Sequence, residues 1–243
     1  MASDARASVV VSLAVMHAAF DPRRKSMLTE LLPRLAGDWG SVSVIEDHDR
    51  VGPWPTARRA WLSAAPDATH HVVVQDDVLP CERFFEHMRA ALAAAPDSMV
   101  CAYSNNRLAQ APEVATSSWV YIPDNAWGQC LAMPRSRARH YVEWCDQVVP
   151  ASYPHDDGRF HLYACSQGLP VLCTQPSLVD HLGADSSTLG HRGRFPQRAR
   201  VFEAQISPTK DWSLGLQAAH RVTEKGFAAQ YERRMRQVRK WDR

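Results

Sequence analysis

His70-His71-Val72-Val73-Val74 is a short apolar run, and Gln75-Asp76-Asp77 follows it directly. A run this rich in Val is typical of a strand that is buried on both faces of a sheet. The two adjacent carboxylates then come at the carboxyl end of that strand, which is where open α/β sheets bind their ligands. The stretch therefore predicts both a central strand and the edge of the sheet at which a site forms.

Two further runs of the same kind precede it, Ser8–Met16 and Ser41–Ile45. Helical spacing of apolar residues separates the first two runs at Arg23–Leu35, and a helix capped by Thr56 is predicted to run through Leu62. Pro80 is predicted to open a further helix through Phe84 to Leu92. This alternation of strands and helices over roughly the first hundred residues predicts an α/β fold. We expect a mostly parallel central sheet with helices on both faces.

The second half of the chain is less regular. Short strands are predicted at Met99–Tyr103, Trp119–Ile122, Gln129–Met133 and Pro170–Thr174. Helices are predicted at Ser136–Val148 and from Asp156 or Asp157 to Gly168, and the C-terminal stretch from Leu214 is expected to be mainly helical. The segment Gln175–Gly190 is expected to be a loop.

The chain has 243 residues, enough for one large α/β domain with an appendage. We place the main domain at residues 1–191 and a basic, mainly helical extension, packed on that domain, at residues 192–243. The extension holds 13 Lys and Arg against 5 Asp and Glu, a local charge of +8. Such a run is either a solvated helix face or a surface that meets a polyanion such as nucleic acid or an anionic membrane.

The six cysteines form no CxxC pair, and no His-rich spacing accompanies them as in a zinc site. Buried thiols in a reducing compartment are the favoured interpretation. The apolar run Val9–Met16 is too short to span a bilayer and lacks the layout of a signal peptide. We therefore expect a cytoplasmic protein without a transmembrane segment.

Three polar clusters are candidates for chemistry. In the first, Asp76 and Asp77 have no neutralising neighbour in the sequence, so a divalent cation would relieve their repulsion. In the second, Tyr153–Arg159, Asp156 and Asp157 stand at a predicted helix N-terminus. Each cluster also has a purely structural interpretation, as acidic caps of a strand end and of a helix.

The third cluster runs from Gln175 to His191 and combines His181 with glycines and small hydroxyl residues. These residue types suit metal and phosphate contacts, because they expose backbone N–H groups beside an imidazole. The alternative is a surface loop that carries a solvent-exposed histidine.

In this order, the clusters resemble motifs of glycosyltransferases of the GT-A fold, especially bacterial and phage enzymes of the lipooligosaccharide and family-2-like kind. Gln75-Asp76-Asp77 is similar to the DxD motif, with Gln in its first place, and Trp127–Met133 to the strand that lines the acceptor side. His155-Asp156-Asp157 resembles the acidic motif that supplies the base. Pro176–Gly183 with Ser186-Ser187 resembles the segment that closes on the nucleotide diphosphate.

The resemblance spans about residues 8–191 and implies roles for individual residues. Asp77 would be the principal metal ligand and His181 a further metal or diphosphate contact. Asp76 would contact the donor ribose or, through water, the metal. The remaining implied contacts with the donor are Asp47 at the nucleoside, Arg58 near the base or diphosphate, and Ser186 and Ser187 at the diphosphate.

The same resemblance implies a metal-dependent, inverting glycosyltransferase that uses Mn²⁺ or Mg²⁺ and a nucleotide-sugar, with a UDP-sugar as first choice. Asp157 would be the general base, and Asp156 is the second choice. The anionic acceptor is either a hydroxymethylated base of DNA or a lipid-linked or surface saccharide. The alternative of another class is a catalytically inactive nucleotide-sugar-binding module, to which Gln75 points.

Overall fold

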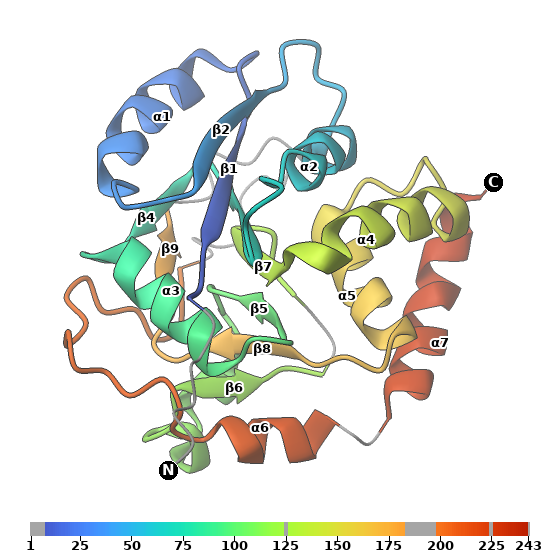
Figure 1. The fold of residues 1–243 in the computed structure, drawn as a ribbon. Coiled ribbons are helices and arrows are strands. Elements are labelled where there is room, and N and C mark those ends of the chain that lie inside the picture. Colours follow the sequence, from blue (N-terminus) through green and yellow to red (C-terminus); the bar gives the residue numbers. More distant parts are fainter. Residues whose placement is uncertain (1–7, 124–125, 183–197, 224–225, 243) are drawn as a thin grey trace.

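The computed structural model describes residues 8–123, 126–182, 198–223 and 226–242 (Figure 1). Its first half alternates strands and helices, as the apolar periodicity predicts. The elements are β1 (Val11–His17), α1 (Pro22–Arg34), β2 (Ser41–Glu46), α2 (Pro53–Leu62), β3 (His70–Gln75), β4 (Val78–Pro80), α3 (Phe84–Ala94) and β5 (Met99–Cys101).

The second half begins with two 3₁₀ turns, η1 (Arg107–Gln110) and η2 (Pro112–Val114). Its strands are β6 (Trp119–Tyr121), β7 (Cys130–Pro134), β8 (Val171–Thr174) and β9 (Val179–His181). Its helices are α4 (Arg135–Val148), α5 (Asp156–Ser166), α6 (Leu216–Thr223), α7 (Phe227–Val238) and the closing 3₁₀ turn η4 (Arg239–Trp241).

Among the described residues, seven strands form the central sheet in the order β2-β1-β3-β7-β5-β8-β6. β1 pairs in parallel with both β2 and β3, and β5 pairs in parallel with β8. β7 runs antiparallel to β3 and β5, and β6 runs antiparallel to β8. Five strands thus point the same way and two point the other way, so the sheet is mixed, with a parallel majority.

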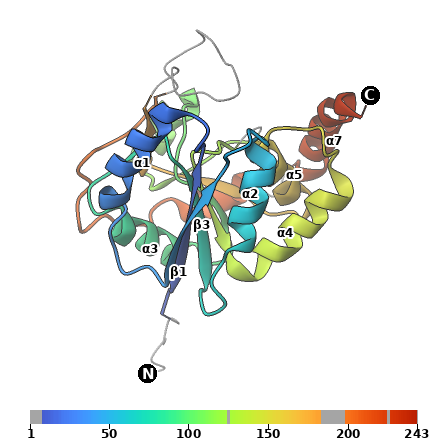
Figure 2. The ribbon, with the colours of Figure 1, turned by 90° about the horizontal axis from the view of Figure 1, so that it is seen from above.

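Helices cover both faces of this sheet. Seen from above, α1 and α3 lie on one face, and α2, α4 and α5 lie on the other (Figure 2). The Val-rich strands β1 and β3 are buried along nearly their whole length, which is why they read as continuous apolar runs. In β2 half-buried and exposed residues alternate, because this strand forms the edge of the sheet.

A second, two-stranded sheet joins β4 to β9, and Val78 pairs with His181 in it. The expectation that Gln175–Gly190 is a loop is therefore wrong over Val179–His181. The expectation that a helix opens at Pro80 is also wrong, because Pro80 ends β4 and α3 begins only at Phe84. Both strands have three residues, too few to show an alternating pattern.

The C-terminal part of the chain packs on the rest of the molecule. Residues 211–214 lie along residues 117–119, where Trp119 Nε1 donates to the Trp212 carbonyl at 2.6 Å. α7 lies against α5, and Met235 and Val238 fill a small apolar cluster with Leu162 (Figure 1). The six cysteines are buried free thiols, as expected. None of the described helices has the length and apolar character needed to cross a membrane.

Candidate active site

Four polar side chains lie at the carboxyl ends of three neighbouring parallel strands. His17 ends β1, Asp47 follows β2, and Asp76 and Asp77 follow β3. The register of β1 with its two neighbours brings these ends to one edge of the sheet, because Met16 pairs with both Ile45 and Gln75. This is the edge at which the sequence predicts a site.

The two adjacent carboxylates are buried and held by a basic network. Nδ1 of His17 lies 2.6 Å from Asp76 Oδ2, which also accepts the Ala18 N–H at 2.9 Å. The guanidinium of Arg24, in the first turn of α1, bridges the pair: Nη1 donates to Asp76 Oδ1, and Nη2 lies 2.8 Å from Asp77 Oδ2. The pair has no neutralising neighbour in the sequence, but the fold brings Arg24 to it from 52 positions away.

His181 completes this network from the second sheet. Its Nε2 lies 3.0 Å from Asp77 Oδ2, because the pairing of β4 with β9 brings it beside the residue that precedes β4. The predicted association of Asp77 with His181 is thus present in the geometry. We name the group of His17, Arg24, Asp76, Asp77 and His181 the acidic-pair cluster.

Burial dominates the electrostatics of Asp76. It raises the pKa of this carboxyl, and the charge of Arg24 opposes that increase. The neighbouring charge of Asp77 raises the pKa of Asp76 further, while the hydrogen bond from His17 lowers it. The charged form of Asp76 therefore depends on its basic neighbours.

Asp47 and Arg58 do not join the acidic-pair cluster. The Asp47 carboxylate accepts the backbone N–H groups of Asp49, Val51 and Gly52 at 3.1–3.3 Å, so it holds the loop after β2. Arg58 makes an ion pair across the surface with Asp146 of α4 at 2.9 Å. The arginine that contacts the acidic pair is Arg24, and Arg58 faces another helix.

Gly128 lies close both to the last residue of β3 and to the first residue of α5. A methyl group added at Gly128 would lie 2.8 Å from Gln75 Nε2, and 3.2 Å and 3.4 Å from the two carboxylate oxygens of Asp156. Gln75 and Asp156 therefore border the same small space, and a side chain at position 128 would fill it. Gln129 Oε1 is buried close by in the chain, with no hydrogen-bond partner among the described residues.

The position of Asp156 is set by a buried arginine one turn further along α5. Arg159 Nη2 donates to the carbonyls of Pro150 and Tyr153 at 2.6 Å and 2.7 Å, and the guanidinium stacks over Trp54 at 4.5 Å. These contacts fix the loop that leads into α5. His155 is the N-cap residue and makes no side-chain cap hydrogen bond, and both acids lie in the first turn of α5.

Asp156 and Asp157 lie in different surroundings. Asp156 is 7% exposed, and burial, together with the charge of Asp157, raises its pKa to about 7. Asp157 is half-buried, and its Oδ1 accepts the Gly158 N–H at 2.6 Å. A carboxyl whose surroundings raise its pKa toward neutrality is a common feature of acid–base catalysis.

Ser186 and Ser187 lie outside the described residues. Asp180, which precedes that segment, contacts residues 198 and 199, which follow it. Its carboxylate accepts the Ala199 N–H at 2.7 Å and pairs with Arg198 at 2.8 Å. Arg198, whose side chain is half exposed, therefore lies close to His181, and its Nη1 donates to the His181 carbonyl at 3.3 Å.

The acidic-pair cluster fits a divalent cation poorly as it stands. Asp76 Oδ1, Asp76 Oδ2 and Asp77 Oδ2 all accept from protein donors, and Arg24 already supplies positive charge. Hard cations require several accessible oxygen ligands. Across the part of the chain that the structure describes, no group of three or more His, Cys, Asp and Glu side chains is arranged to hold a metal ion.

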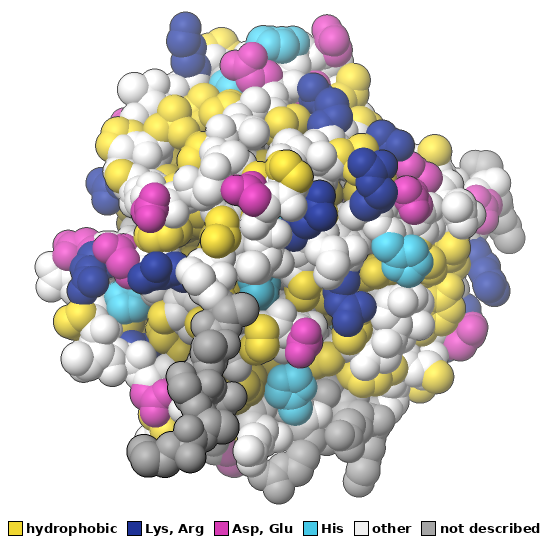
Figure 3. Space-filling model, in the orientation of Figure 1, with side chains coloured by type: hydrophobic (Ala, Val, Ile, Leu, Met, Phe, Trp, Pro, Cys, Tyr) yellow, Lys and Arg dark blue, Asp and Glu magenta, His cyan; other side chains and the backbone are white. Residues whose placement is uncertain are grey.

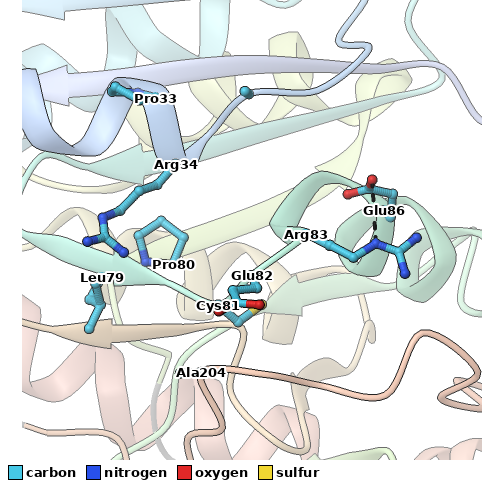
Figure 4. A pocket seen from close by; sticks show the side chains of 10 residues that line it. Pro33, Arg34, Leu79, Pro80, Cys81, Glu82, Arg83, Glu86 and Ala204 are labelled. Carbon is cyan, nitrogen blue, oxygen red and sulfur yellow. Dashed lines mark ion pairs between the residues drawn. The ribbon is translucent and has the colours of Figure 1, made fainter.

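A surface pocket of about 430 Å³ lies beside β4, between α1 and the start of α3 (Figure 4). Both charge signs line it, with Arg34, Arg83, Glu82 and Glu86, and Arg83 pairs with Glu86 at 3.7 Å. It contains none of the residues that the sequence predicts for the site.

Comparison of this chain with models of known protein families and with curated protein sequences finds no match. The interpretation of the site therefore rests on its own geometry. Sequence reasoning missed His17, Arg24, Gly128 and Arg159. His17 could have been found as the last residue of a buried strand, and Arg24 from its helical spacing with the apolar residues of α1. Gly128 and Arg159 show their roles only in the folded structure.

Proposed function

We propose that the chain is a glycosyltransferase of the GT-A fold class, which transfers a sugar from a nucleotide-sugar to an acceptor hydroxyl. The observation that carries this proposal is the convergence at Gly128. There Gln75, the last residue of β3 and the one before the acidic pair, borders one space with Asp156 at the start of α5. This space lies at the edge of the sheet where open α/β sheets bind ligands. A transferase needs these two functions side by side, donor binding and proton removal.

The donor is assigned to the side of the acidic-pair cluster, and a UDP-sugar is the first choice. Arg24, His17 and His181 place basic groups around Asp76 and Asp77. Arg198 adds a half-exposed guanidinium at the end of β9. Basic groups of this kind stabilise the negative charge that develops on a departing nucleoside diphosphate.

The acceptor is assigned to the side of Asp156 and Asp157. One of these carboxylates takes the proton of the acceptor hydroxyl, whose oxygen forms a bond to the anomeric carbon as the bond to the diphosphate breaks. Attack from the face opposite the leaving group inverts that carbon. The pKa of about 7 favours Asp156 as the tuned group, since a general base works best when its pKa lies near the working pH.

A hydroxymethylated base of DNA is a specific candidate acceptor. Arg236, Arg239 and Lys240 are exposed at the end of α7 and in the turn that follows. Trp241, 45% exposed, lies beside them, with its ring 6.3 Å from that of His155. Basic side chains with an exposed aromatic ring suit phosphates and unstacked bases. Here the aromatic ring, Trp241, lies beside His155, the residue before Asp156.

A lipid-linked or surface saccharide is the other acceptor class, because an anionic membrane would also attract this basic turn. On the face shown in Figure 3, basic and acidic side chains are interspersed. The case for an anionic acceptor therefore depends on the basic residues at the end of α7 and not on the charge of the whole surface. An inactive nucleotide-sugar-binding module, the alternative to which Gln75 points, would bind donors without turnover.

The test is a donor screen. Purified protein is titrated with UDP-, GDP- and dTDP-sugars, and release of the nucleoside diphosphate is followed with and without duplex DNA that contains hydroxymethylated bases. Asp156→Asn and Asp157→Asn should bind the donor normally, and at least one should lose turnover by about a hundredfold or more. Asp38→Asn, at an exposed carboxylate before β2, is the matched control. If no nucleotide-sugar binds at millimolar concentration, the proposal is refuted.

A further inference from the structure

Arg24 lies where two buried carboxylates would otherwise need a cation. It occupies the first turn of α1, and Asp21 caps that helix by accepting the Arg23 N–H at 3.0 Å. The side chain of Arg24 points inward and is 5% exposed, while Arg23 beside it pairs with Asp21 at the surface. The two adjacent arginines thus have opposite environments.

The guanidinium matches the acidic pair in geometry. Its two terminal nitrogens contact different carboxylates, Nη1 that of Asp76 and Nη2 that of Asp77. A planar guanidinium is suited to bridging two oxygen acceptors, and it remains charged at any physiological pH. Asp76 and Asp77 are each 2% exposed, so water cannot take over this role.

We propose that Arg24 takes the place of a divalent cation at the acidic pair, so that the site works without a resident metal ion. The arginine shares its single positive charge between Asp76 and Asp77, beside the position assigned to the donor diphosphate. The part that concerns the donor rests on the proposed glycosyl transfer. The part that concerns metal affinity rests on the contacts of Arg24 alone.

Two consequences follow for metal binding. In the wild-type chain, a cation that uses Asp76 Oδ1 or Asp77 Oδ2 must displace Arg24. Mn²⁺ should therefore bind to the wild type no more tightly than it binds to Asp77→Asn. In Arg24→Met the carboxylates lose their counter-charge but keep their places. Mn²⁺ should then bind at least about tenfold tighter than to wild type, because no guanidinium competes for the same oxygens.

The experiment is a Mn²⁺ titration by calorimetry or electron paramagnetic resonance on wild type, Arg24→Met, Asp77→Asn and Arg23→Met. Arg23→Met is the matched control, since it removes an adjacent arginine at the surface. Thermal unfolding of each protein is measured in chelator and in excess Mn²⁺. We expect Mn²⁺ to raise the midpoint of Arg24→Met by several degrees and to leave wild type and Arg23→Met unchanged.

Tight Mn²⁺ binding by wild type that Asp77→Asn abolishes would overturn the proposal, and so would an Arg24→Met protein with no gain in Mn²⁺ affinity. If Arg24→Met does not fold, the Mn²⁺ affinities of wild type and Asp77→Asn are compared instead, and a higher affinity of the wild type would overturn the proposal. Transfer by wild type in chelator is measured separately. A chain that binds no nucleotide-sugar would refute the proposed function and leave the metal titration intact.

Discussion

Replacing Asp156 with Asn should make the protein more stable at alkaline pH while it removes transfer. Burial and the charge of Asp157 raise the pKa of Asp156 to about 7, from an ordinary value of 3.8. The folded state therefore binds this proton more tightly than the unfolded state does. The resulting stabilisation is complete below pH 4 and is lost as the pH rises through 7. Asn has no such proton, so its contribution is independent of pH.

The size of the effect follows from the linkage of proton binding to folding. Between pH 5 and pH 8, the free energy of unfolding of the wild type should fall by roughly 2.5 kcal/mol relative to that of Asp156→Asn. The comparison of two proteins cancels the other groups that titrate in this range. The measurement is urea-induced unfolding followed by fluorescence of the eight tryptophans at several pH values.

Two controls make the prediction specific. Asp38→Asn, at an exposed carboxylate, should follow the wild type across the pH range. Asp157→Asn removes the neighbouring charge, so the pKa of Asp156 should fall and the pH dependence should become shallower. Parallel curves for wild type and Asp156→Asn, within about 0.5 kcal/mol from pH 5 to pH 8, would show that Asp156 titrates as an ordinary carboxyl. The assignment of a tuned base would then fail.

Three further predictions concern other parts of the site. Gly128→Ala should change the free energy of unfolding by less than about 1.5 kcal/mol, because the end of the Gln75 side chain can move aside. It should nevertheless lower the rate of transfer at least about tenfold. A variant as active as the wild type in a kinetic assay would contradict this. Arg58→Met should cost less than about 1 kcal/mol of stability and leave donor affinity unchanged in calorimetry, because its ion pair with α4 is at the surface. Three exposed basic residues, Arg236, Arg239 and Lys240, are replaced together by Gln. The KM for an anionic acceptor should rise and its salt dependence should fall, while donor hydrolysis stays unchanged. A KM that is unchanged at two salt concentrations would refute a role of these residues in acceptor binding.

Substitution is preferable to truncation in the last of these experiments. Removing α7 from Arg233 onward would also remove Met235 and Val238, which pack against α5. Loss of activity would then report on the folding of α5 as well as on the acceptor. The exposed side chains can be neutralised while that apolar contact remains.

Local sequence patterns were enough to predict most strands and helices, though not β4 and β9, and the edge of the sheet at which polar residues gather. Both properties depend on local patterns, the continuous apolar runs of β1 and β3 and the acids that follow them. The sequence also identified Asp77, His181, Asp156 and Asp157 as candidate site residues, because these residue types suit chemistry at strand ends and at a helix N-terminus.

Which groups meet follows from the fold and cannot be read from local patterns. Arg24 and Asp76 are 52 positions apart in the chain. Helical spacing puts Arg24 on the buried face of α1 with Leu31, unlike its neighbour Arg23, but that spacing does not identify its partner. Gly128 joins Gln75 to Asp156 only because β7 lies next to β3 in the sheet, and Arg58 turns away because Asp146 of α4 lies within its reach. Charge pairing depends on distance in space, and a local pattern carries no information about partners that the fold brings together from far along the chain.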